Sequence, residues 1–107
     1  MKLEKIAQIQ LQDKMRRLKF EQFSNILLGN PRRAKKYHQE FAKIAVKNFD
    51  LAKTLSPPIK GSFSIFSKQG FNALKYIFFD FFAKDSAEEK QLKKLWHEFN
   101  YKRDINL

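Results

Sequence analysis

The scarcity and placement of helix-breaking residues constrain this chain more than any other feature. Its 107 residues include only three Gly and three Pro, and these cluster at breaks between segments whose apolar residues recur at helical spacing. With no Cys, the chain has neither disulfides nor thiolate metal sites. It is long enough to bury a core of its own. The sequence therefore predicts a single all-α domain, residues 1–107, built as a compact bundle of four helices.

The first two predicted helices form an antiparallel hairpin. The first, residues 3–28, is apolar on two sides, which allows it to pack against a neighbouring helix and against a second copy of the chain. Gly29 suits the end of this helix, because glycine adopts a left-handed conformation without strain. Asn30 suits the capping position of a second helix, residues 31–55, with Pro31 in its first turn. So short a connection predicts an antiparallel pair.

An ordered loop and a third helix are predicted to follow. Two prolines end the second helix, and the loop at about 56–66 is expected to be pinned to the bundle by its Phe and Ile side chains. The third helix, residues 67–84, is expected to be central, with Tyr76 and Phe79 outside its broad apolar face. The residues on that face are Phe71, Leu74, Ile77, Phe78, Phe81 and Phe82.

A fourth helix is predicted from Ser86 to about Tyr101. Ser86 and Glu89 have the spacing of a capping box, in which each satisfies a backbone N–H of the other. One face of this helix is apolar and is expected to close the core, with the indole N–H of Trp96 near the surface. Its apolar residues are Leu92, Leu95, Trp96 and Phe99.

Positive charge is unevenly distributed along the chain. Residues 1–79 contain sixteen Lys and Arg against five Asp and Glu, whereas residues 80–107 contain six of each, so the first three quarters carry the whole net charge of +11. Self-repulsion at this charge destabilises a compact state, so the excess indicates an anionic partner. Codon bias in an AT-rich genome is another origin for Lys and Phe, but it does not explain basic residues outnumbering acidic ones two to one.

The densest basic segment spans residues 14–36, where Glu21 is the single acid. Its second half occupies the first turns of the second predicted helix, where the helix dipole disfavours cations by roughly 0.3–1 kcal/mol each. A helix N-terminus with added cations is instead typical of an anion site, and phosphate is its natural occupant. We therefore predict nucleic-acid binding, DNA or RNA, through the phosphate backbone by ten basic residues: Lys14, Arg16, Arg17, Lys19, Arg32, Arg33, Lys35, Lys36, Lys43 and Lys47.

Three alternatives stay open. The cations can form an ordinary solvated surface, since those of the first helix point in different directions around it. The turn at 29–31 also gives the outline of a helix–turn–helix motif, although short turns between helices are common. The strongest alternative is a protein-interaction module, such as a small inhibitor or accessory subunit of a nucleic-acid enzyme or ribonucleoprotein, which docks on an acidic protein.

No catalytic or cofactor-binding constellation is recognisable. His38 and His97 stand in no metal-ligand spacing, and the isolated glycines form no phosphate-binding loop. We therefore expect no enzyme activity, no cofactor and no metal. The longest apolar stretch is too short for a membrane span, and residues 1–11 lack the apolar centre of a secretory signal. A cytoplasmic protein without membrane contact is predicted.

Overall fold

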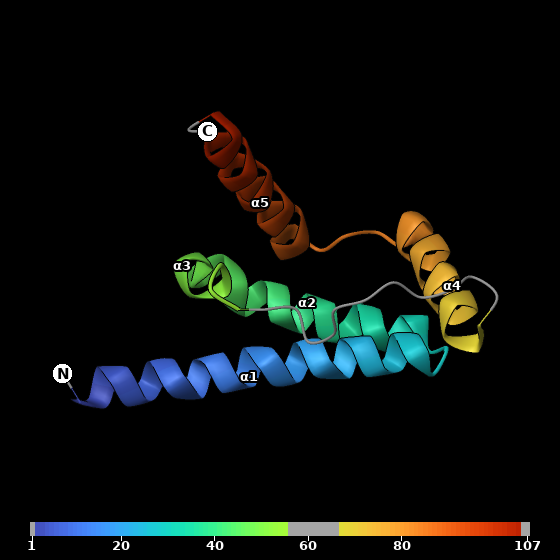
Figure 1. Cartoon of the computed structure of the whole chain (residues 1–107), viewed down its shortest axis with the longest axis horizontal. Coiled ribbons are helices and arrows are strands. Elements are labelled where there is room, and N and C mark those ends of the chain that lie inside the picture. The colour runs from blue at the N-terminus through green and yellow to red at the C-terminus, as the bar shows by residue number, and fades with distance from the viewer. Residues whose placement is uncertain (1, 56–66, 106–107) are drawn as a thin grey trace.

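The described part of the protein, residues 2–55 and 67–105 of a computed structural model, consists of helices and contains no strand. These are α1 (Lys2–Leu27), α2 (Pro31–Lys47), α3 (Phe49–Ala52), α4 (Lys68–Phe82) and α5 (Ala87–Ile105). In Figure 1, α1 and α2 lie side by side and antiparallel, α4 stands at the end where they are joined, and α5 leads away from α2. The predicted all-α fold with an antiparallel hairpin is confirmed. The predicted loop at 56–66 lies outside the described residues.

The connection between α1 and α2 has a geometry that glycine permits. Gly29 has a φ of +79°, and its N–H donates to the carbonyl oxygen of Ile26 at 3.1 Å. The N–H of Asn30 donates to the carbonyl oxygen of Asn25 at 2.8 Å, which completes a Schellman motif at the end of α1. Pro31 occupies the first turn of α2 as predicted. Asn30 occupies the N-cap position of α2 as predicted, but its side chain makes no capping hydrogen bond.

The helix predicted to continue from 31 to 55 is interrupted at Asn48. The Nδ2 of Asn48 donates to the carbonyl oxygen of Ile44 at 3.1 Å, and the backbone leaves the helical region with φ −133° and ψ 50°. Asn side chains compete for helix carbonyls in this way. The break separates α3 from α2, and the ring of Phe49 packs edge-on against Trp96 of α5, with centroids 5.1 Å apart.

The apolar core lies where α1, α2, α3 and α5 meet. Among the described residues, its buried members are Met15, Leu18, Phe41, Ala42, Ala45, Ala52 and Leu92. Trp96 is half-buried against this cluster, in agreement with its predicted place at the core. Fully burying a side chain the size of Met or Phe stabilises a fold by roughly 1.5–3 kcal/mol. No residue of α4, all of which is described, belongs to this core.

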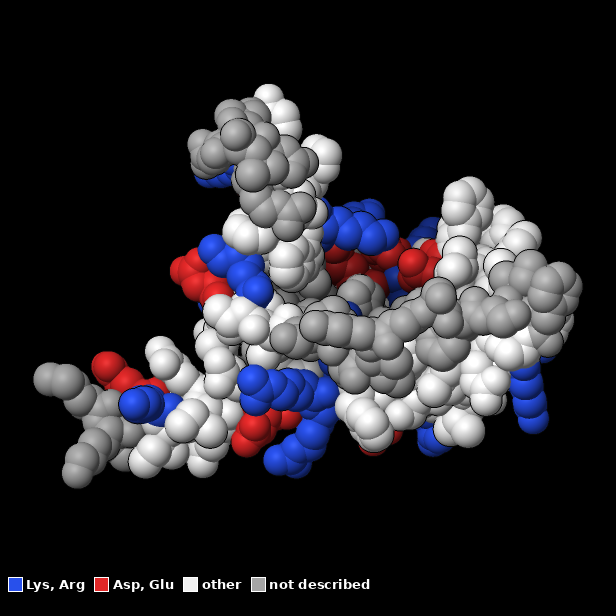
Figure 2. All heavy atoms as spheres, in the orientation of Figure 1, with Lys and Arg blue, Asp and Glu red and all other residues white. Residues whose placement is uncertain are grey.

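The apolar face of α4 is turned to solvent, so the prediction of a central helix with that face in the core is wrong. Tyr76 and Phe79, predicted to lie outside, are half-buried instead. In Figure 2 the described surface over α4 is mainly white. The apolar side chains that it exposes, by 43–82%, are Phe71, Leu74, Ile77, Phe78, Phe81 and Phe82.

Polar contacts spaced four residues apart on α4 explain this orientation. Residues at i, i+4 and i+8 lie along one face of a helix, and here that face is polar and turned inward. Three residues of α4 make these contacts, and we call them the polar stripe: Asn72, Tyr76 and Asp80. The contacts are Asn72 Nδ2 donating to the Leu27 carbonyl oxygen (2.8 Å), Gln22 Nε2 donating to the Tyr76 hydroxyl (3.0 Å), and Lys35 Nζ donating to Asp80 Oδ1 (2.9 Å).

The start of α5 has the predicted capping box. The Ser86 N–H donates to Glu89 Oε1 at 3.0 Å, and the Glu89 N–H donates to Ser86 Oγ at 3.2 Å. Leu92 of α5 is buried in the core, as its position on the apolar face predicted. Across residues 2–55 and 67–105, no helix combines the length and the apolar character that crossing a bilayer requires.

Candidate nucleic-acid interface

The outer face of α2 carries a line of cations that we call the α2 stripe. The opposite face holds the buried Ala34, Phe41 and Ala45, so the core determines which way the stripe points. From its first to its last residue the stripe is roughly 22 Å long, at 1.5 Å per residue. Glu40 is exposed in the same region of the helix. The members of the stripe are all exposed: Arg32, Lys36, Lys43 and Lys47.

A hollow lies at the N-terminal end of α2, beside the start of the stripe. No acidic residue stands in the first turn, and the Asn30 side chain leaves the helix end uncapped. The positive end of the helix dipole therefore adds to the charge of two exposed guanidinium groups. An anion in this hollow would meet both. The cavity has a volume of about 410 Å³ and is lined by Gly29, Asn30, Pro31, Arg32, Arg33 and Phe79.

The exposed cations of α1 do not form a second stripe. Lys14, Arg16 and Arg17 are all exposed, but successive side chains project about 100° apart around a helix. Arg16 also lies 3.7 Å from a carboxylate oxygen of Asp13. Figure 2 shows blue groups along the hairpin separated by white and red ones. α1 therefore adds scattered positive charge and not a continuous surface.

Lys19, predicted as a phosphate contact, is directed into the hairpin. Its Nζ lies 4.3 Å from the centroid of the Phe41 ring, donates to Gln22 Oε1 at 3.0 Å and lies 3.2 Å from His38 Nδ1. Burial lowers the pKa of Lys19 to about 8. Burial, with the charge of Lys19, lowers the pKa of His38 to about 4, so His38 is neutral at pH 7 and its Nδ1 accepts from Lys19.

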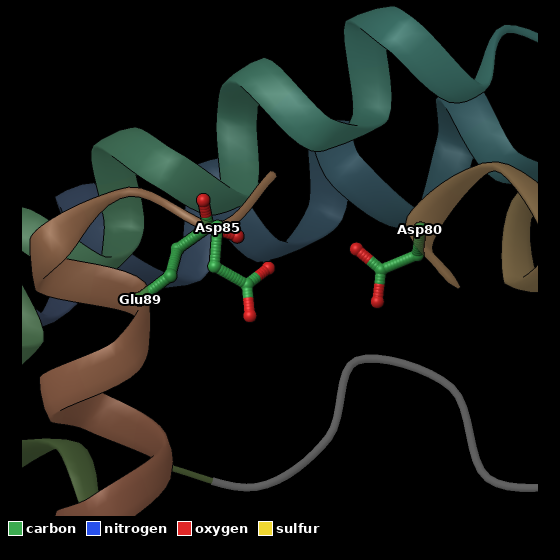
Figure 3. A group of neighbouring side chains, drawn as sticks. All are labelled: Asp80, Asp85 and Glu89. Carbon is green, nitrogen blue, oxygen red and sulfur yellow. The ribbon is translucent and has the colours of Figure 1, made fainter. Parts of the chain in front are cut away.

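Lys35, also predicted as a phosphate contact, is buried among three carboxylates. Its Nζ lies 2.9 Å from Asp80 Oδ1, 2.7 Å from Asp85 Oδ1 and 2.7 Å from Glu89 Oε2. Figure 3 shows that the carboxylates come from α4, from the link after it and from the first turn of α5. We call these four residues the Lys35 cluster. Because the Lys35 side chain is only 6% exposed, a phosphate does not reach it.

Lys35 and two of its partners, Asp85 and Glu89, have pKa values shifted toward the charged state. Burial alone would lower the pKa of Lys35, but the hydrogen-bonded carboxylates outweigh it and raise that pKa. Hydrogen bonds from Lys35 and Lys93 lower the pKa of Asp85 to about 2. Burial opposes the ionisation of Glu89, yet Lys35 and the Ser86 N–H hold its pKa below the ordinary value. Lys35, Asp85 and Glu89 are therefore all charged at neutral pH.

The three carboxylates of the Lys35 cluster also approach one another as metal ligands do, with one oxygen from each within 4.8 Å of the others. The ammonium group of Lys35 lies at ion-pair distance from all three. Lys35 thus offsets one of their three negative charges, and Lys93 also pairs with Asp85. Because the partners come from three segments, the cluster joins α2 to α4 and α5.

One signal in the sequence indicates a buried Lys35. It stands seven residues before Ala42, on the same helical face as the core residues of α2. A buried cation needs an acidic partner, and residues 80–89 are the most acidic part of the chain. Helical spacing therefore identifies Lys35 as an inward residue, but it does not identify the carboxylates that meet it.

Comparison of the chain with known protein families, with curated proteins and with solved structures gives no match. The functional inference therefore rests on the residues of this chain and on their placement.

Proposed function

We propose that the protein binds nucleic acid through backbone phosphates, with the α2 stripe and the hollow at its start as the contact surface. One observation carries the proposal. Five exposed cations of α2 form no ion pair with any other residue in the described ranges, whereas the buried Lys35 of the same helix has three carboxylate partners. These five cations, exposed and without an ion-pair partner among the described residues, are Arg32, Arg33, Lys36, Lys43 and Lys47.

The dimensions of the α2 stripe suit a phosphate backbone. A length of roughly 22 Å spans about six nucleotides of one strand, at a rise of 3.4 Å each. Arg32 and Arg33 can each bind a phosphate through two parallel N–H···O bonds, and the lysines act as point charges. Contacts of this kind respond to charge and not to base sequence. We therefore expect binding with little sequence preference.

The salt dependence of binding tests the proposal. Labelled oligonucleotides of about 20 nucleotides, as duplex DNA, single-stranded DNA and RNA, are titrated with the protein and followed by fluorescence anisotropy. If five phosphates are neutralised, affinity for duplex DNA falls on the order of several hundred-fold between 50 and 200 mM salt. Absence of binding at about 50 mM salt contradicts the proposal, because phosphate contacts are strongest there.

Charge reversal tests the location of the site. Arg32→Glu combined with Arg33→Glu is expected to abolish binding without loss of helicity by circular dichroism. Lys90→Glu combined with Lys94→Glu makes the same charge change on exposed residues of α5 and is the matched control. The control is expected to keep most of the affinity. Equal losses in the two variants would show that net charge, and not the start of α2, determines binding.

A further inference from the structure

The outward face of α4 has the residue spacing of a coiled-coil seam. Phe71, Leu74, Phe78 and Phe81 are separated by three, four and three residues, so they occupy the a and d positions of two heptads. All four are exposed, by 53%, 43%, 64% and 82% respectively. We call these four residues the α4 seam. Ile77, at a g position and 63% exposed, widens it.

The apolar area at this face is that of a protein interface. With roughly 200 Å² for each Phe and the observed exposed fractions, the six exposed apolar side chains of α4 present on the order of 700 Å². The largest apolar patch on a typical monomer is about 300–600 Å². Each partner in a stable complex buries about 800 Å². A partner covering the face of α4 would therefore bury an interface of ordinary size.

Positive charge flanks the α4 seam. Lys68 and Lys75 are exposed, and both fall at e positions of the same heptads. The Nζ of Lys75 lies 4.8 Å from the centroid of the Phe71 ring, at the border of the seam. Asp80, the single acid of α4, faces inward and pairs with Lys35. The exposed charges of α4 are thus all positive, which is complementary to an acidic partner.

We propose that the α4 seam binds an acidic amphipathic helix of another protein. Such a helix has apolar residues at its a and d positions and Glu or Asp where it faces Lys68 and Lys75. Apolar burial supplies the affinity, and the flanking ion pairs select the partner and its direction. This function goes beyond nucleic-acid binding and uses a different helix. Because the polar stripe already holds α4 to the hairpin, its outward face is presented without rearrangement of the fold.

A second copy of this chain is a poorer occupant of the seam. Antiparallel pairing of two α4 helices sets e positions against e positions, which brings Lys75 opposite Lys75 and Lys68 opposite Phe82, with no acid at either position. Parallel pairing sets e against g, where this chain has Gly70 and Ile77 and no acid. In both arrangements the net charge of +11 on each copy adds repulsion.

Two synthetic helices test the inference with the full-length protein. The probe has about three heptads with Leu at a and d and Glu at e and g, so that its own charges oppose self-association. The control peptide has Lys in place of each Glu. Fluorescence anisotropy is expected to show binding of the Glu peptide and not of the Lys peptide. Lys68→Glu combined with Lys75→Glu is expected to reverse this preference.

Substitutions in the seam complete the test. Phe78→Ser combined with Phe81→Ser is expected to weaken binding of the Glu peptide more than about tenfold. Circular dichroism checks that the fold persists, which the exposure of both rings predicts. Phe20→Ser, on a 58% exposed Phe of α1, is the matched control and should leave affinity unchanged. These variants keep every cation of α2, so this inference and nucleic-acid binding fail independently.

Three results overturn the inference. Equal affinity of the seam variant and the wild type for the Glu peptide would mean that net charge alone attracts it. A dimer in sedimentation equilibrium that the seam variant dissociates, with no peptide bound, would assign the face to a second copy. Binding to phosphatidylglycerol vesicles through the seam, again with no peptide bound, would assign it to a membrane surface.

Discussion

α2 and α4 are amphipathic helices of similar length, 17 and 15 residues, that turn opposite faces toward the rest of the protein. α2 buries apolar residues such as Phe41 and leaves its cations in solvent. α4 turns Asn72 and Asp80 inward and leaves rings such as Phe78 in solvent. An amphipathic pattern therefore defines two faces of a helix, whereas the groups that the helix packs against decide which face is buried.

The partners of α4 are polar groups of the hairpin. A hydrogen bond between neutral groups contributes a net 0.5–1.5 kcal/mol, and one to a charged group about 1.5–3 kcal/mol. If α4 rotated to bury its Phe residues, Lys35 would lose Asp80, and the carbonyl oxygen of Leu27 would lose Asn72. An unpaired buried group costs more than a hydrogen bond contributes. The polar-stripe contacts, that of Lys35 with Asp80 among them, therefore hold α4 in its observed orientation.

The largest expected effect comes from removing the cation at the centre of that cluster. Lys35→Met leaves the buried Glu89 without its lysine partner and Asp85 with Lys93 alone, and should lower the free energy of unfolding by about 3–5 kcal/mol. Urea denaturation followed by circular dichroism measures it. Lys36→Met, on the exposed neighbour, is the matched control, with an expected change within about 0.5 kcal/mol. Equal effects of the two substitutions would show that the cluster does not hold α4 to α2.

The stability difference between wild type and Lys35→Met should depend on pH. The pKa of Asp85 is about 2, against an ordinary 3.8, and that of Glu89 is also lowered. A carboxyl group whose pKa is lower in the folded state stabilises the fold above its unfolded pKa, and this contribution is lost as pH falls through the folded value. The stability difference between wild type and Lys35→Met should therefore shrink from about pH 4 to pH 2. A stability difference that stays constant between pH 4 and pH 2 would show that Lys35 does not stabilise the charged forms of Asp85 and Glu89.

A smaller effect is expected at the middle contact of the polar stripe. Tyr76→Phe removes the hydroxyl that accepts from Gln22, and should lower the free energy of unfolding by about 1 kcal/mol. Tyr101→Phe, on a 62% exposed tyrosine of α5, is the control and should change it by less than about 0.5 kcal/mol. If the two substitutions change the free energy of unfolding equally in urea denaturation, the Gln22 contact does not help to hold α4.

Local chemistry made much of the fold predictable. Gly29 ends α1, and the Ser86–Glu89 box begins α5, because each depends on residues within one helical turn. The break at Asn48 is also local, but an Asn is compatible with both a helix and its end. The orientation of α4 is not local. It depends on a contact between Lys35 and Asp80, which are 45 residues apart in the chain.

The same distinction applies to the candidate interface. Helical periodicity against the core predicts that Lys36 and Lys43 point outward, and both are exposed. The inward position of Lys19 depends on His38 and Phe41. That of Lys35 depends on acidic residues far along the chain. Charge density marks a basic segment, but packing decides which of its cations reach solvent.

Paired truncation of one Phe on each helix tests the opposite orientation of α2 and α4 most directly. Phe41→Ala should lower the free energy of unfolding in urea by about 3–5 kcal/mol, because it removes a ring that is only 4% exposed. Phe78→Ala should lower it by less than about 0.5 kcal/mol, because that ring is 64% exposed. A loss above about 2 kcal/mol for Phe78→Ala would mean that the apolar face of α4 is buried in solution, and would contradict the opposite orientation of the two helices.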